Sequence, residues 1–249
     1  MRFFIQFSYF GKAYHGWQNQ PNAITVQEVL ENAMSKLLNS TISVMGAGRT
    51  DTGVHAKEMY AHFDIEQLTE IPELLFRLNS YLPNDIAVQR IFEVKDDAHA
   101  RFNAIARTYE YHISKTKDPF IMDMAHFIWK NLDLAKMNTA AEFLIGKKDF
   151  ECFSKSNTDV FTNICDLREA KWSVENDKLI FTITADRFLR NMVRAIVGTL
   201  LNVGAGKYSA DYVNTILKSK DRTIAGASVP AKGLYLTSIV YPNTILKNG

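Results

Sequence analysis

The stretch from Ala170 to Thr184, AKWSVENDKLIFTIT, is the clearest indicator of fold class in this chain. Two candidate strands, Ala170–Val174 and Leu179–Thr184, flank the turn-forming pair Asn176-Asp177. This arrangement predicts an antiparallel hairpin. Further strands and helices are mixed along the rest of the chain, and such a mixture with hairpins indicates an α+β fold rather than a doubly wound parallel sheet.

The remaining secondary structure follows from the spacing of apolar residues, which alternate in strands and recur every three or four positions in helices. Thr25 and Glu28 have the spacing of a capping box, in which the two residues satisfy free amides of the first helical turn. The other predicted strands cover residues 3–10, 41–45, 59–65, 86–94, 109–113 and 234–240. The predicted helices cover about residues 26–38, 72–81, 133–145, 188–203 and 210–218.

The composition is that of an ordinary globular protein, with 47% hydrophobic and 22% charged residues. That much apolar surface can offset chain entropy, which excludes wholesale disorder. The formal net charge of +2 excludes a histone-like basic protein, and it permits nucleic acid as a partner only through a local basic surface. Cys152 and Cys165 are too few for a disulfide scaffold and make a poor metal site. We expect two buried thiols in a reducing compartment.

Nothing in the sequence indicates export or a membrane segment. The N-terminal run MRFFIQFSYFGK, residues 1–12, is too short and too polar in its apolar part for a signal peptide. The longest apolar stretch, residues 195–203, contains Gly198 and Asn202 and is far too short to cross a bilayer. We therefore expect a soluble, cytoplasmic protein.

A length of 249 residues fits one large domain or two small ones. The order of strands and helices repeats loosely after residues 104–108, which predicts two halves, 1–105 and 106–249, packed closely because no low-complexity linker separates them. The first half has 9 basic and 12 acidic residues, a net charge of −3, and the second has 20 and 15, a net charge of +5. The positive excess therefore belongs to the second half.

Arginines are concentrated in one segment of that second half. Between Arg187 and Ala210 the chain has four basic residues and no acidic one. Arg187, Arg190 and Arg194 are three and four positions apart, which places them on one face of the predicted helix over residues 188–203. The stripe is either a solvated helix face or a surface that contacts RNA phosphates, and the spacing leaves both possibilities open.

The most unusual segment is GAGRTDTGVHA, residues 46–56, in which three glycines within eight residues allow a tight backbone path. It lacks both the Gly-Lys-Ser/Thr ending of a phosphate loop and a Gly-x-Gly-x-x-Gly pattern. Arg49 and Asp51 place opposite charges two residues apart at its centre. An aspartate between two threonines in such a loop is more often a turn former than a catalyst, so both roles are open on this basis.

Residues 48–56, GRTDTGVHA, resemble the catalytic loop of the tRNA pseudouridine synthase A family. The resemblance continues in the same order over almost the whole chain. Its other signatures are YFG at 9–11, GWQNQ at 16–20, TVQE at 25–28, HARFNA at 99–104, RTYEY at 107–111, FLRNMVR at 188–194 and GLYL at 233–236. A nine-residue loop with ordered companions is a highly specific signal.

The resemblance implies an isomerase that converts uridine to pseudouridine in tRNA, at positions 38, 39 and 40 of the anticodon stem-loop. The N-glycosidic bond breaks, the uracil turns, and C5 is joined to the ribose. Because nothing is oxidised or reduced, no cofactor is expected, and no metal either. The resemblance also implies two related α/β-sandwich halves with a mainly antiparallel sheet joined across a central catalytic cleft, and a homodimer in which one tRNA contacts both subunits.

Three catalytic residues are implied by the resemblance. Asp51 matches the essential aspartate, which either attacks the ribose or base or takes a proton from the sugar. Arg194 matches the arginine that pairs with this aspartate and keeps it ionised. Tyr109 matches the tyrosine that stacks on the uracil, and its hydroxyl is suited to removing the C5 proton. Without the resemblance, Tyr109 fits a core position of a strand, and Arg194 fits a surface site.

The resemblance also assigns residues to RNA binding. Arg49 matches an arginine that helps to hold the flipped nucleotide, because a base inside a stem must leave the stack before it can be rearranged. His55 either positions the loop or contacts RNA. The other residues assigned to substrate binding are Thr50, Arg187, Arg190 and Leu234.

The chain departs from the family pattern at two places. Phe10–Lys12 follows Tyr9 where Asp-Gly-Thr is usual, and Val229–Lys232 stands where Ala-Pro-x-His is usual. These changes bear on the choice of uridine and not on the reaction. The alternatives are a paralogue with another RNA target, a non-catalytic RNA-binding protein of the same fold, and a phosphate-binding or hydrolytic enzyme. The presence of Asp51 argues against the second, and the missing phosphate-loop lysine argues against the third.

Overall fold

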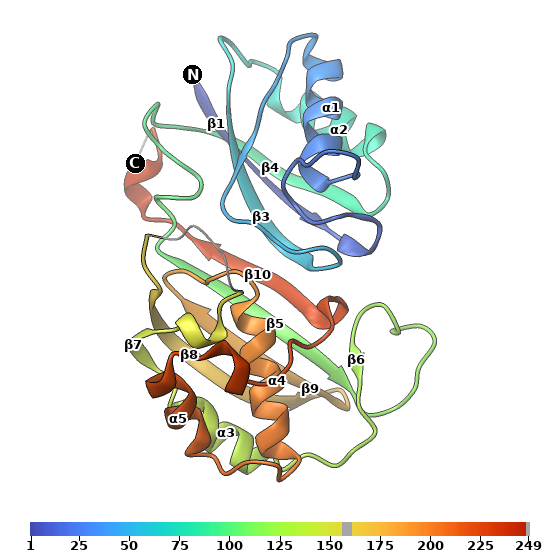
Figure 1. The fold of residues 1–249 in the computed structure, drawn as a ribbon. Helices are drawn as coiled ribbons and strands as arrows, with labels where there is room; N and C mark the ends of the chain where they lie inside the picture. The colour runs from blue at the N-terminus through green and yellow to red at the C-terminus, as the bar shows by residue number, and fades with distance from the viewer. Residues whose placement is uncertain (156–160, 248–249) are drawn as a thin grey trace. The chain divides into compact units, whose positions relative to one another are not determined.

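The computed structural model describes residues 1–155 and 161–247, and within them it has five α-helices and ten β-strands (Figure 1). The α+β fold class is as predicted. The contacts divide the chain into two units, Met1–Ile105 with Tyr235–Gly249, and Ala106–Leu234. The last segment therefore lies with the first unit, whereas the sequence analysis placed it in the second half.

The first unit contains the strands in the order β4-β1-β3-β10. β1 runs antiparallel to both β3 and β4, whereas β10 runs parallel to β3, with Tyr235 opposite His55. A short strand β2 also pairs with β3. The bounds are β1 Arg2–Tyr9, β2 Met45–Gly46, β3 His55–Asp64, β4 Ile86–Val94 and β10 Leu234–Val240.

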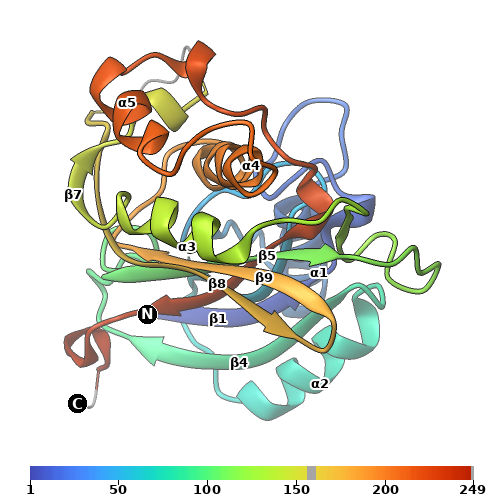
Figure 2. The ribbon, with the colours of Figure 1, turned by 90° about the horizontal axis from the view of Figure 1, so that it is seen from below.

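Two helices complete the first unit, α1 (Val26–Leu38) and α2 (Ile71–Tyr81), and both begin close to where the sequence predicts. They pack against each other, and α2 packs against β4 (Figure 2). The Glu28 amide donates to Thr25 Oγ1 at 3.2 Å, which confirms Thr25 as the N-cap of α1.

The strand predicted over residues 41–45 is wrong for most of its length, because only Met45–Gly46 forms β2. Side chains of α1 provide the reason. The Ile42 amide donates to Ser35 Oγ at 2.9 Å, and the Val44 amide donates to Glu31 Oε1 at 2.8 Å. Backbone donors satisfied by side chains have no need of a strand partner, so the segment follows the helix instead of joining the sheet.

The second unit has the antiparallel order β5-β9-β8-β7, with β6 parallel to β5. The predicted hairpin is confirmed: Asn176 and Asp177 connect β8 to β9 at φ +47° and +63°, the left-handed region that a tight two-residue turn requires. The bounds are β5 Ala106–Ser114, β6 His126–Phe127, β7 Gly146–Asp149, β8 Ile164–Glu175 and β9 Lys178–Ala185.

Helices α3 (Leu134–Glu142), α4 (Met192–Gly204) and α5 (Tyr212–Ser219) belong to the second unit (Figure 2). α4 is the most buried of the three and packs on α3, which in turn packs on β8. A Cβ at Gly204 would lie 2.4 Å from Met137 Sδ, so the two helices approach closely where this glycine lies.

Both cysteines are free and buried, as predicted. Burial raises the pKa of each thiol to about 12, so neither is ionised near neutral pH. In the part of the chain that the structure describes, no helix has the length and apolar character needed to cross a membrane.

Candidate active site

The loop that carries Asp51 joins β2 to β3 in the first unit. It closes in a turn in which the Val54 amide donates to the Asp51 carbonyl at 3.1 Å. Gly53 provides the third residue of the turn at φ +76°, a conformation that few L residues adopt. The turn uses the main chain of Asp51, whose side chain is half-buried. The turn therefore does not need the Asp51 carboxylate.

Thr50 is held by Tyr9 of β1 and by Trp17 of the loop that follows β1. Its side chain is buried, and its hydroxyl shares a 2.7 Å hydrogen bond with the hydroxyl of Tyr9. Its carbonyl accepts a 3.1 Å hydrogen bond from the Trp17 amide. Gly16 stands at φ +91°, and a Cβ there would lie 2.5 Å from the Thr50 carbonyl oxygen. The backbone of residues 16–17 thus lies directly against the residue before Asp51.

The base of the loop rests on an aromatic pair. A Cβ at Gly46 would lie 2.6 Å from the Trp17 ring, which itself stacks on Phe7 at a centroid distance of 5.4 Å. Arg49, by contrast, is exposed. The loop therefore has a packed base and an arginine side chain directed to solvent beside Asp51.

The far end of the loop is attached to Gly11 and His55. The Gly11 amide donates to His55 Nδ1 at 2.9 Å, and a Cβ at Gly11 would lie only 2.0 Å from the Val54 carbonyl oxygen. The His55 ring is 1% exposed, stacks on Phe10 and meets the Tyr235 ring in a tilted arrangement. Of the two roles that the sequence leaves open for His55, this burial favours positioning of the loop.

Tyr109 lies on β5 in the second unit, opposite Ile183 of β9. Its ring is half-buried and meets Phe188 edge to face at 5.2 Å and 87°. Tyr111, two residues further along the same strand, is fully buried and donates its hydroxyl to the Pro230 carbonyl at 2.9 Å. The buried strand position that the sequence pattern allows for Tyr109 is therefore occupied by Tyr111 instead.

Arg194 lies in the first turn of α4 and is half-buried. Its Nε donates to the Val229 carbonyl at 2.7 Å, and the Val229 amide donates back to the Arg194 carbonyl at 3.2 Å. Burial raises the pKa of Tyr111 well above its usual value, and the nearby Arg194 charge opposes that rise. The guanidinium is therefore fixed along the segment before β10, close to the buried tyrosine.

The predicted arginine stripe on one helix face is wrong. α4 begins at Met192, because Asn191 adopts the left-handed conformation at φ +65° and its amide group donates to Ser228 Oγ. Arg187 and Arg190 precede the helix and cannot share a helical face with Arg194. Asn191 itself was the available sequence signal, since asparagine tolerates that conformation better than most residues.

The two arginines before α4 have different surroundings. Arg187 is half-buried, and its guanidinium donates to the Thr162 carbonyl at 3.0 Å. Arg190 is exposed, and its carbonyl accepts from the Lys155 amide at 3.0 Å. Leu234, the other residue assigned to substrate binding in this unit, is 6% exposed at the start of β10.

The sequence model of a family described as tRNA pseudouridine synthase matches residues 5–103 and 140–242. The chain belongs to this family. It is 50% identical to the tRNA pseudouridine synthase A of Porphyromonas gingivalis over 98% of each chain. It is 49% identical to that of Bacteroides fragilis, over 99% of this chain and 98% of the relative. The enzyme of that name from Francisella tularensis subsp. holarctica is 38% identical, over 98% and 96%.

Membership of the tRNA pseudouridine synthase family confirms the resemblance carried by the Asp51 loop. Sequence reasoning still missed the residues that hold this loop, namely Tyr9, Gly11, Gly16 and Trp17. They lie in quoted family signatures but had no role assigned. Their partners, Thr50 and His55, lie 33 to 44 residues away in the chain, so no local pattern shows the pairing.

A second missed group fixes the loop before α4 in this pseudouridine synthase. Asp186 Oδ1 accepts from the amides of Asp166 and Arg187 at 2.8 and 2.7 Å. The Arg107 guanidinium donates to the Asp186 carbonyl at 2.8 Å. These bonds hold the backbone from which Phe188 reaches Tyr109. Among residues 1–155 and 161–247, no three His, Cys, Asp or Glu side chains form a group able to hold a metal ion.

Proposed function

We propose that this chain is a tRNA pseudouridine synthase that acts on uridines 38, 39 and 40 of the anticodon stem-loop. The observation that carries the proposal is the fixed loop around Asp51, which has the family motif and is attached at both ends to residues 9–17. Full-length relatives named tRNA pseudouridine synthase A support tRNA as the substrate. Such an activity belongs in the cytoplasm, where tRNA is available.

The reaction breaks the C1′–N1 bond of the nucleotide and forms a C1′–C5 bond, while a proton leaves C5 and N1 gains one. Asp51 supplies the carboxylate, either as a nucleophile toward ribose or base or as a base toward the sugar. A carboxylate on a loop held at both ends is pre-positioned, and such positioning can lower a barrier by several kcal/mol. No other reagent is required, so the proposal includes neither metal nor cofactor.

The other residues complete this assignment. Tyr109 stacks on the uracil and takes the C5 proton, which its half-buried ring and fixed Phe188 neighbour favour. Arg194 is the assigned partner of the Asp51 carboxylate. The exposed Arg49 and Arg190 contact the RNA, whereas Arg187 is partly occupied by the Thr162 carbonyl.

The decisive test is formation of pseudouridine in an unmodified tRNA transcript, detected by carbodiimide labelling and primer extension. Wild type should form it without added metal or nucleotide, at positions 38–40 only. Asp51→Asn, which keeps the size of the side chain, should form none while binding the tRNA as wild type does. Activity in Asp51→Asn would reject the assigned role. Pseudouridine at other positions would identify a paralogue with another target.

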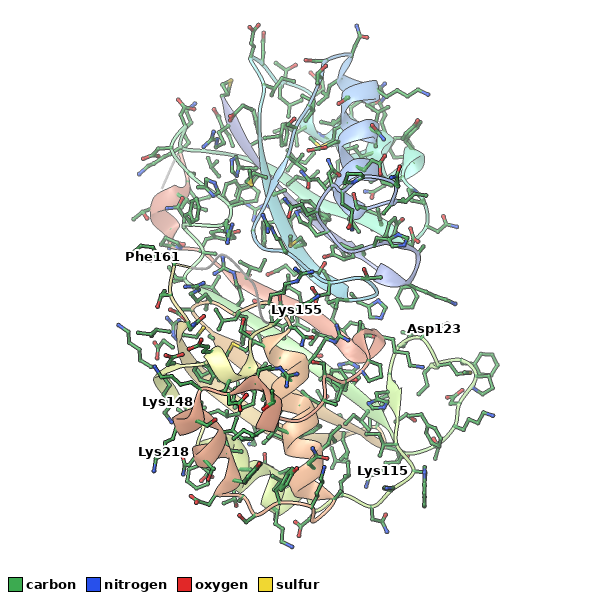
Figure 3. The ribbon with its side chains drawn as sticks, viewed as in Figure 1. Lys115, Asp123, Lys148, Lys155, Phe161 and Lys218 are labelled. Atoms are coloured by element: carbon green, nitrogen blue, oxygen red, sulfur yellow. The ribbon has the colours of Figure 1, made fainter. Side chains whose placement is uncertain are left out.

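We further propose that the active form is a homodimer. The segment that follows β5 passes Lys115 and Asp123 and carries five exposed, large apolar side chains (Figure 3). These are Phe120, Met122, Met124, Phe127 and Trp129, exposed by 91, 49, 42, 42 and 75%. Such a concentration on a surface commonly marks a protein interface. Sedimentation velocity should show a dimer for wild type and a monomer for Phe120→Ser with Trp129→Ser; an unchanged dimer would place the interface elsewhere.

A further inference from the structure

We propose that His55 is a positioning residue for this reaction: its neutral ring fixes the end of the Asp51 loop by accepting the Gly11 amide. The kinetic consequence rests on the proposed function. The hydrogen bond itself is a feature of the first unit and can be tested without any activity.

The surroundings of His55 exclude contact with substrate and favour a fixed ring. The side chain is 1% exposed. It stacks on Phe10 at 4.3 Å and 12°, and contacts the tilted Tyr235 ring at 4.7 Å and 34°. Two rings cannot both lie at these distances on one face of an imidazole, so Phe10 and Tyr235 cover opposite faces. The ring can rotate little between them, and only its edge is available for hydrogen bonds.

The protonation state follows from the donor. A backbone N–H can only donate, so Nδ1 must offer a lone pair to the Gly11 amide at 2.9 Å. The proton of the neutral ring therefore lies on Nε2. An imidazolium would place an N–H at Nδ1 against the Gly11 N–H and would lose the bond. The structure thus requires one tautomer of neutral His55.

The Gly11–His55 hydrogen bond acts directly after the turn of residues 51–54, which contains Asp51. Gly11 lies so close to Val54 that a Cβ there would be 2.0 Å from its carbonyl oxygen. The Val54 amide in turn closes the turn onto the Asp51 carbonyl at 3.1 Å. A shift of His55 is therefore transmitted to Asp51 through the side-chain bond to Gly11 and two backbone contacts, Gly11 with Val54 and Val54 with Asp51. Misplacement of a catalytic group by about 1 Å can cost about 100-fold in rate.

Phe10, one of the departures from the family pattern, packs against His55. It stands where aspartate is usual, and its ring covers one face of His55. A phenyl ring at this position places no carboxylate against this face of the imidazole.

The test uses two substitutions at position 55 that differ in the acceptor. His55→Asn places Oδ1 near the position of Nδ1 and keeps an acceptor for the Gly11 amide. His55→Phe keeps an aromatic ring between Phe10 and Tyr235 but has no acceptor. The single-turnover rate at saturating tRNA should fall by about 10- to 100-fold in His55→Phe and by about threefold or less in His55→Asn. The tRNA dissociation constant should change by about twofold or less in both.

His62 provides the matched control, because it lies on the same strand and also accepts a backbone amide, that of Ala100 at 3.2 Å, through Nδ1. His62→Phe should leave the single-turnover rate within about twofold of wild type. An equal loss of rate in His62→Phe and His55→Phe would mean that the slower reaction comes from general destabilisation and not from the Gly11 bond. Weaker tRNA binding in place of a slower step would mean that His55 contacts RNA. Either result overturns the proposal, as does a His55→Asn rate as low as that of His55→Phe.

Two measurements on the protein alone separate this inference from the proposed function. Nitrogen-15 NMR should show His55 with an unprotonated Nδ1 and a protonated Nε2. Hydrogen exchange of the Gly11 amide should be fast in His55→Phe and slow in wild type and His55→Asn. If wild type forms no pseudouridine, the proposed function fails while these measurements still test the bond. A protonated Nδ1, or an unprotected Gly11 amide in wild type, would refute the inference.

Discussion

A comparison of Gly16→Ala with Gly206→Ala measures how tightly residues 16–17 hold the Asp51 loop. Both glycines have positive φ, +91° and +74°. They differ in their surroundings, because a Cβ at position 16 would lie 2.5 Å from the Thr50 carbonyl oxygen, whereas a Cβ at position 206 would meet no atom beyond its chain neighbours within 4 Å. The difference between the two variants therefore isolates the contact with the loop.

The magnitude follows from these two terms. Forcing alanine into the left-handed region costs about 1–2 kcal/mol, which is the whole effect expected for Gly206→Ala. An overlap with a main-chain oxygen adds about 1–3 kcal/mol, because backbone and not a flexible side chain must move. Gly16→Ala should therefore lose about 2–5 kcal/mol. A protein with ordinary stability of about 5–15 kcal/mol remains folded in most of this range.

The assay has two parts, urea unfolding for the free energy and single-turnover pseudouridine formation for the position of Asp51. Gly206→Ala should lose stability but keep the wild-type rate constant at temperatures where it is folded. Gly16→Ala should lose more stability and also react at least about 10-fold more slowly. Equal losses of stability in the two variants, or a wild-type rate in folded Gly16→Ala, would refute the idea that this segment fixes the loop.

Three further predictions concern other contacts. Tyr9→Phe should cost about 1–3 kcal/mol in urea unfolding because it leaves the buried Thr50 hydroxyl without its partner, and Tyr9→Phe combined with Thr50→Val should cost less than the sum of the single changes. Burial lowers the pKa of His62 to about 4 in the folded protein, whereas histidine in the unfolded chain has a pKa near 6.5. The free energy of unfolding of wild type should therefore fall as the pH drops from about 6.5 to 4, and it should fall less in His62→Gln. An equal pH dependence of the two proteins would contradict this prediction. With thiol pKa values of about 12, Cys152 and Cys165 should react with a maleimide near neutral pH only at the rate of unfolding, which rapid labelling of the native protein would disprove.

The elements with local determinants were predictable from the sequence. The N-cap at Thr25 and the Asn176-Asp177 turn depend on neighbouring residues, and both are present as predicted. The Asp51 loop was recognisable because its nine residues carry a specific motif. Each of these features needs only a few consecutive residues to be defined.

The failures have nonlocal or competing causes. Residues 41–44 have a strand-like pattern, but side chains of α1 occupy their amides. The helical spacing of apolar residues runs through Asn191 in residues 188–203, but the left-handed conformation of Asn191 makes the helix begin only at Met192. The last strand joins β3 of the first unit through a pairing between residues 180 positions apart, Tyr235 and His55. In each case the deciding partner lies outside the window that a pattern covers.

The segment of residues 9–17 links substitutions outside the Asp51 loop to the position of Asp51. It reaches the Asp51 loop through Tyr9 and Trp17 on one side and Gly11 on the other, and most of these contacts are made by backbone atoms. Backbone contacts tolerate many side chains but fix position closely, which fits a segment that departs from the family pattern at Phe10 and Lys12 but not at Gly11. Substitutions in this segment should therefore act on the rate of the chemical step before they act on tRNA affinity. The opposite order is expected for the exposed Arg49 and Arg190.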